Sequence, residues 1–340
     1  MELSAKVKKS LNIGLRILVA LLAFWFIYEQ VFITGDFTNF REEISVKFED
    51  SAFLSLLILA LVFMPLNWGI EAFKWQLLIS YVEKVSYVNS FRSVLTGISM
   101  SLFTPNRIGE FFGRVFTLKL NDPLKGVLLT IAGSVSQLMA TLLFGLLASL
   151  FFIRKYFNIS ETWQWFFFAG IALFALIISL LMVMLFLRAP VLSAKVHSII
   201  RPGWKRIHEY IAVLQSVRRS TLLKVLLLSI SRYIVFSMQF YILLRAFNLG
   251  IPFLSAFVLI SMTYFVMTAI PTVALVDMGI RGSVAIFFIS SYFSDTALVA
   301  TQILSATTLI WIINLALPAL LGLLFINRLT ILRRSRTNGI

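Results

Sequence analysis

The sequence contains no cysteine and only two histidines, His197 and His208, and this excludes several kinds of chemistry. Without cysteine there is no disulfide, no thiolate metal site and no cysteine nucleophile. Two histidines in one basic loop do not make the ligand cluster that a catalytic metal centre needs. We therefore expect neither a metal nor a cofactor, and we do not expect an enzyme.

Charged residues are also scarce, at 13% of the 340 residues, whereas 59% are hydrophobic. An average soluble domain is about 25% charged. So little polar surface excludes a soluble enzyme, a disordered protein and a soluble repeat array. We expect an all-α polytopic membrane protein formed by a single integral membrane domain, residues 1–340.

The charge that is present is mainly positive, with a formal net charge of +15 and a sequence pI of about 10.3. The basic residues flank apolar spans, which favours a topological role and contact with anionic lipid headgroups over nucleic acid. Basic residues mark the cytoplasmic side of a membrane. We therefore expect both termini and the basic loop, residues 188–220, on the cytoplasmic face of the inner or plasma membrane.

Long apolar runs predict about six full transmembrane helices, each of about 20 residues or more. The expected spans are residues 11–33, 53–70, 126–153, 163–187, 225–244 and 297–326. The basic loop separates a first half, residues 1–187, from a second half, residues 221–340. Its pattern favours an amphipathic helix lying on the cytoplasmic leaflet.

Two further stretches, residues 90–120 and 252–294, are apolar but are interrupted by polar breaks. Their apolar runs are too short to cross the membrane as simple spans. The charge rule makes the first stretch enter and leave by the cytoplasmic face, and the second by the outer face. We expect two opposed hairpins, either re-entrant or paired helices, within an inverted repeat.

The two breaks carry similar charges, because Glu110 and Arg114 are four residues apart, as are Asp277 and Arg281. An arginine near the bilayer centre costs about 2.5–3.5 kcal/mol, so such residues normally face a partner or a polar path. Each pair therefore either helps to bind a ligand or only neutralises itself, and the spacing leaves both possibilities open.

Thr104 and Pro105 are typical of the N-cap and first position of a helix. That helix would place Arg107, Glu110 and Arg114 on one face, and its N-terminus beside Arg107 would favour an anion. The expected binding residues are Asn106, Arg107, Glu110, Arg114, Asp277 and Arg281. The expected structural residues of the hairpins are Thr104, Pro105, Gly109, Pro271 and Gly279.

Several other polar residues are weaker candidates. Glu71 and Arg92 are expected at the membrane interface, and Arg232 is expected to face a partner or a polar path. Gln137 and Asn314 lie in apolar spans and are typical of hydrogen bonds between helices.

Residues 104–114, TPNRIGEFFGR, resemble the transmembrane, flippase-like region of bacterial lysylphosphatidylglycerol synthases, which carries Pro-x-Arg-Ile-Gly-Glu and a following Arg. The stretch from Pro271 to Arg281 is similar to a second motif of that family, which ends Gly-Val-Arg-Glu. The glutamate of that motif falls on Gly282 here, and Asp277 could take its place. We expect no aminoacyl-transferase domain of the synthase kind, so the resemblance implies lipid translocation and not aminoacylation.

We therefore expect a flippase-like lipid translocase that binds the anionic headgroup of a phospholipid or a lipid-linked precursor, with membrane lipids as its partners. Two alternatives remain open. A secondary transporter of a small organic anion fits the same residues, and a membrane-embedded lipid-modifying enzyme fits them less well because no acidic metal cluster is present in the sequence.

Overall fold

The structure is a computed structural model that describes residues 44–102, 104, 107–119, 122–156, 161–199, 205–270 and 274–326, with Gly14, Leu18, Leu21 and Trp25. Within these ranges the regular structure is helical, with no strand. The first half contains α3 (Ser51–Ile79), α4 (Tyr87–Ser101), α5 (Gly109–Val115), α6 (Pro123–Tyr156) and α7 (Glu161–Leu187). The basic loop contains α8 (Ala189–Ile199) and α9 (Lys205–Ser216). The second half contains α10 (Arg219–Ala246), α11 (Phe253–Ala269), α12 (Ala274–Ser290), α13 (Thr296–Trp311), the π-helical turn η3 (Ile312–Ala316) and α14 (Leu317–Leu323).

Among the described residues, five helical segments are long and apolar enough to cross a membrane, and they confirm five of the six predicted spans. They are α3, α6, α7, α10 and the continuous stretch from α13 to α14. The remaining prediction, residues 11–33, falls almost entirely outside the described residues. The chain is therefore an all-α integral membrane protein.

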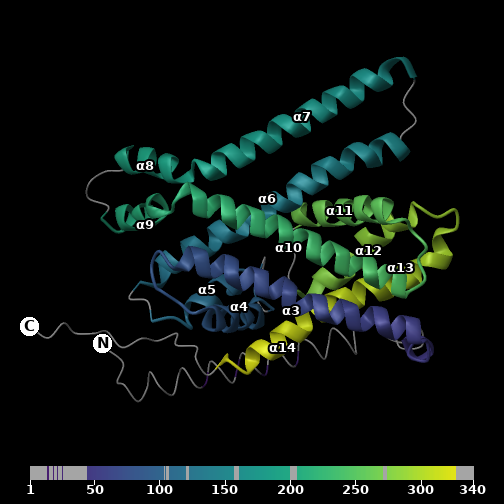
Figure 1. Cartoon of the computed structure of the whole chain (residues 1–340), viewed down its shortest axis with the longest axis horizontal. Helices are drawn as coiled ribbons and strands as arrows, with labels where there is room; N and C mark the ends of the chain where they lie inside the picture. Colours follow the sequence, from purple (N-terminus) through teal and green to yellow (C-terminus); the bar gives the residue numbers. More distant parts are fainter. Residues whose placement is uncertain are drawn as a thin grey trace, which may run out of the picture.

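The two predicted hairpins are pairs of short helices. In the first, α4 and α5 have 15 and 7 residues and pack against each other. In the second, α11 and α12 have 17 residues each and also pack together. Figure 1 shows the two pairs towards opposite ends of the long central helices, with α4 and α5 on the left and α11 and α12 on the right.

Contacts between the two halves come in matching pairs. The first long helices of the halves, α3 and α10, lie side by side and run in opposite directions (Figure 1). The first hairpin helix, α4, packs on α14 of the second half, while its counterpart α11 packs on α6 of the first half. Within the halves the contacts also match, because α5 contacts α6 in the first half and α12 contacts α13 in the second. Matching contacts of this kind are typical of an inverted repeat.

Glycines allow the closest approaches between these helices. A Cβ at Gly322 of α14 would collide with the backbone of Leu95 in α4, and one at Gly145 of α6 would collide with Phe265 in α11. Small residues let membrane helices pack backbone against backbone. A glycine therefore lies at each of the two contacts through which a hairpin helix packs on the other half, α4 on α14 and α11 on α6.

Replacing Gly97 with alanine is expected to destabilise the α4–α5 pair. The new Cβ would lie 2.7 Å from Arg114 Cγ and 2.9 Å from the backbone oxygen of Glu110. Overpacking of this kind costs about 1–3 kcal/mol, whereas alanine gains about 1 kcal/mol in helix propensity. Thermal melting in detergent measures the difference. Gly170→Ala in α7, where nothing lies within 4 Å, is the matched control and should be neutral or stabilising; equal melting temperatures for both variants would contradict close packing at Gly97.

Candidate functional site

A buried carboxylate, Glu71 of α3, joins the first hairpin to the two central helices. Glu71 is 3% exposed, and its oxygens lie 2.7 Å from Lys74 Nζ, 2.8 Å from Arg114 Nη1 and 3.2 Å from Arg232 Nη1. Lys74 is one turn further along α3, Arg114 comes from α5 and Arg232 from α10. One acid therefore receives cations from three helices, because each would be costly in the membrane without a partner.

The predicted pairing of Glu110 with Arg114 is confirmed, because Arg114 donates a hydrogen bond to Glu110 and bridges it to Glu71. Arg107 lies 3.7 Å from the other oxygen of Glu110. The ion cluster thus consists of Glu71, Lys74, Arg107, Glu110, Arg114 and Arg232. It holds four cations against two carboxylates, so its excess positive charge attracts an anion.

A chain of amide hydrogen bonds continues from the ion cluster into the second half. Arg232 Nε donates to Asn67 Oδ1 at 2.9 Å, and Asn67 Nδ2 donates to Asn314 Oδ1 at 2.9 Å. Asn314 Nδ2 then donates to Gln239 Oε1 at 2.7 Å. Gln137 Nε2 donates to the Ser229 backbone oxygen at 3.3 Å, so the predictions of interhelical bonds for Gln137 and Asn314 are confirmed.

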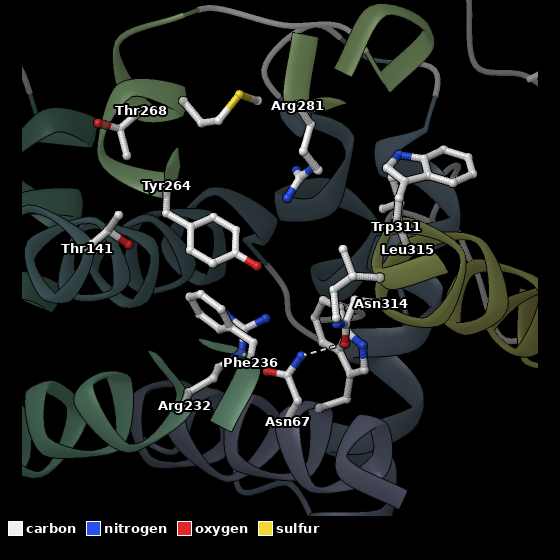
Figure 2. A pocket seen from close by; sticks show the side chains of 13 residues that line it. Asn67, Thr141, Arg232, Phe236, Tyr264, Thr268, Arg281, Trp311, Asn314 and Leu315 are labelled. Atoms are coloured by element: carbon white, nitrogen blue, oxygen red, sulfur yellow. Dashed lines mark hydrogen bonds between the residues drawn. The ribbon is translucent and has the colours of Figure 1, made fainter. Parts of the chain in front are cut away.

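A cavity of about 260 Å³ opens beside this chain and is lined by residues of α3, α6, α10, α11, α12, α13 and η3. We call it the central pocket. Figure 2 shows the guanidinium of Arg281 and the hydroxyl of Tyr264 pointing into it, with the Asn67–Asn314 bond on its other side. Arg232 also lines the pocket, so arginines from α10 and α12 face one space. A π-helical turn carries Asn314 to the wall, and such turns are frequent at functional sites.

Arg281 keeps hydrogen-bonding capacity inside the central pocket. Its Nη2 lies 2.9 Å from Asp277 Oδ2, which confirms the predicted pair. Its Nε is buried, and no partner for it exists among the described residues. Because a buried guanidinium nitrogen without a partner is costly, a ligand that accepts from it would gain a charge-assisted hydrogen bond.

The predicted start of the helix at Thr104 is wrong, because α5 begins at Gly109. Arg107 has a φ of 59°, a left-handed conformation that a helix cannot contain and that residues other than glycine rarely adopt. Thr104 Oγ1 instead accepts the Gly109 N–H at 2.7 Å, so this N–H is not available to an anion. Pro105 and Asn106 lie outside the described residues.

The other predicted hairpin residues differ in their surroundings. Gly109 packs so closely on Met100 that a Cβ would collide with its backbone oxygen, and Gly113 packs on Gly97. Gly279 lies within α12, where a Cβ would meet open space, so packing does not require glycine there. Pro271 lies outside the described residues.

The sequence analysis missed the centre of the ion cluster. It placed Glu71 at the interface, but α3 continues to Ile79, and the side chains of Glu71 and Lys74 are both buried. The signal was local, because Glu71 and Lys74 are three residues apart on one helical face and can neutralise each other. No pattern in the sequence pointed to Tyr264, whose hydroxyl faces the central pocket.

The fold and the site define a polytopic all-α membrane protein with a buried ion cluster and a central polar pocket. The chain belongs to the family of the lysylphosphatidylglycerol synthase TM region, whose match covers residues 13–322. This confirms the resemblance at residues 104–114, and it associates the chain with a membrane-lipid function. No curated protein and no solved structure matches the chain.

Proposed function

We propose that the protein is a lipid translocase that binds the anionic headgroup of a phospholipid or lipid-linked precursor in the central pocket. The observation that carries this proposal is that Arg232 and Arg281, from two different helices of the second half, line one pocket that is completed by first-half residues such as Asn67. Arginine is well suited to phosphate because its planar group donates two parallel hydrogen bonds.

The size of the pocket supports a headgroup as the bound part of the lipid. Its volume of about 260 Å³ is slightly smaller than that of typical ligand pockets, which hold about 300–1,000 Å³. A phosphate with a small substituent fits such a space, whereas two acyl chains do not. The tails therefore stay in the bilayer while the headgroup crosses between the halves.

Arg232 is the residue through which the headgroup would reach the ion cluster. Its contact with Glu71 is 3.2 Å long, compared with 2.7 Å for Lys74 and 2.8 Å for Arg114. Of these three cations, Arg232 alone also lines the central pocket, so it is the one placed to exchange between Glu71 and a phosphate bound there. Alternating access between two inverted halves would use this exchange to open one side and close the other.

We also propose that the lipid is moved without being chemically changed. Glu71, Glu110 and Asp277 each form an ion pair with an arginine, so their carboxylates stabilise cations. A general acid or base needs a carboxyl group that faces the substrate, whereas each of these carboxylates faces an arginine.

The orientation follows from the charges of the basic loop. Arg188, Lys195, Arg218 and Arg219 lie around α8 and α9, at the end of the bundle where α10 begins. We propose that this end faces the cytoplasm of a cell membrane, in accordance with the positive-inside rule. The first hairpin then belongs to the cytoplasmic side and the second to the outer side.

Reconstitution in liposomes tests the proposal. Purified protein should accelerate the transbilayer movement of fluorescent phosphatidylglycerol more than that of phosphatidylcholine. Arg281→Gln should slow the phosphatidylglycerol rate about tenfold or more, because one charge-assisted hydrogen bond contributes about 1.5–3 kcal/mol. Arg281→Lys should retain part of the rate.

Arg245→Gln is the matched control, because Arg245 is exposed at the end of α10 and does not line the pocket. Melting temperatures measured on the same preparations separate lost transport from lost folding. An unchanged phosphatidylglycerol rate in a folded Arg281→Gln protein would reject the pocket as the headgroup site. Movement of a soluble organic anion with no lipid movement would reject the translocase in favour of a solute transporter.

A further inference from the structure

A second cavity, of about 440 Å³, lies at the connection between α3 and α4. None of its lining residues lines the central pocket. Its walls come from the α3–α4 turn, the first turns of α4, the chain that follows α5, and Phe325 just after α14. We call it the turn cavity. Both halves of the protein therefore contribute to it.

Three cations line the turn cavity: Lys84, Arg92 and Lys119. The lining contains one carboxylate, Glu83, and its Oε2 accepts the backbone N–H of Lys119 at 3.0 Å. In the described part of the chain, no carboxylate lies within ion-pair distance of the three cationic groups. The cavity therefore has an uncompensated positive charge, which an anion would neutralise.

Arg92 is held in place by a ring, and its side chain donates no hydrogen bond to any other residue that the structure describes. Its guanidinium lies over the ring of Phe325, 5.5 Å from the ring centroid, and the side chain is half-buried. A cation–π contact orients the group but leaves its N–H donors available. A pre-oriented guanidinium loses less entropy when it binds a phosphate bidentately.

Hydroxyl groups form the polar wall beside Arg92. Ser93 and Thr117 are hydrogen-bonded to each other across α4 and the end of the hairpin, and Thr96 is buried next to them. Thr117 Oγ1 also donates to the backbone oxygen of Arg114 at 2.7 Å. The wall of the turn cavity is thus directly bonded to the segment that carries the ion cluster.

We infer that the turn cavity is a second anion site, which binds a phosphate group through Arg92, Lys84 and Lys119. One guanidinium and two ammonium groups around a volume of this size match the charge and the acceptor oxygens of a phosphate. The phosphate belongs either to the headgroup of an anionic phospholipid or to a soluble phosphate. The inference does not depend on lipid movement through the central pocket.

The experiment uses the full chain in nanodiscs and two probes. The first probe is phosphatidylglycerol, in an equal mixture with phosphatidylcholine, and retained lipid is counted by native mass spectrometry. The second is radiolabelled inorganic phosphate, measured by equilibrium dialysis in nanodiscs of phosphatidylcholine alone. The variants are Arg92→Gln and the double variant Lys84→Gln/Lys119→Gln. Lys84 and Lys119 are exposed, so the double variant should fold normally.

Either variant should weaken the binding of whichever probe the parent chain binds by about tenfold, because each variant removes charge-assisted hydrogen bonds. Lys224→Gln removes one exposed charge from α10 outside the cavity and should leave binding unchanged. Loss of lipid retention identifies a headgroup site, and loss of phosphate binding identifies a soluble ligand. If the variants and the control bind both probes as the parent chain does, the inference is overturned.

Discussion

Replacing Glu71 with glutamine is expected to cause the largest loss of stability of any single change in the ion cluster. The amide keeps the size of the side chain but removes the charge that holds Lys74, Arg114 and Arg232. Removing the charge of one partner in a buried ion pair costs about 3–5 kcal/mol of folding stability, because the other partner is left buried and unpaired. The melting temperature in detergent should therefore fall by roughly 10 °C.

Glu209→Gln is the matched control for this prediction. Glu209 pairs with Lys125 at 3.1 Å, but the side chains are 59% and 26% exposed, so the pair contributes less than about 1 kcal/mol. The double variant Glu71→Gln/Lys74→Met should recover part of the loss, because it removes one of the unpaired cations. Equal melting temperatures for Glu71→Gln and Glu209→Gln would show that Glu71 is not the centre of the cluster.

The second large effect concerns Arg232 and Arg281 together. Arg232→Gln and Arg281→Gln should each slow the movement of phosphatidylglycerol about tenfold, because each removes a donor to the same phosphate. The double variant should slow it by clearly less than hundredfold. Once one arginine is lost, the phosphate no longer bridges the two helices, so the second loss costs less.

The control for this double-mutant cycle is a second cycle that combines Arg245→Gln with Arg281→Gln. Arg245 is exposed and lies outside the pocket, so its effect should simply multiply with that of Arg281→Gln. A full hundredfold loss in the Arg232–Arg281 double variant would mean that the two arginines act on different ligands or at different steps.

Much of the fold was predictable, because apolar length is a strong signal in membrane proteins. The boundaries were less so. The prediction ended the second span at residue 70 because charges follow, whereas α3 runs to Ile79. Charges end a span only when they stay in water, and Glu71 and Lys74 instead neutralise each other inside the protein.

For the candidate site, the local pairs were predictable and the distant ones were not. Glu110–Arg114 and Asp277–Arg281 follow from a spacing of four residues on a helix. The contacts of Glu71 with Arg114 and Arg232 join residues far apart in the chain, so only tertiary packing brings them together. The left-handed Arg107 broke the helix that the capping pattern of Thr104 and Pro105 predicted.

Because the first hairpin packs on a helix of the second half, the parts of the fold must form in a set order during biosynthesis. The α4 backbone against which Gly322 packs is made early, but α14 is made only after all the helices from α5 to α13. Until then the nascent first half holds its charged hairpin with one side uncovered, so the assembly of this half cannot finish before α14 has been made. Ribosome stalling or premature termination anywhere before residue 317 would therefore leave a polypeptide in the bilayer that quality-control proteases can recognise.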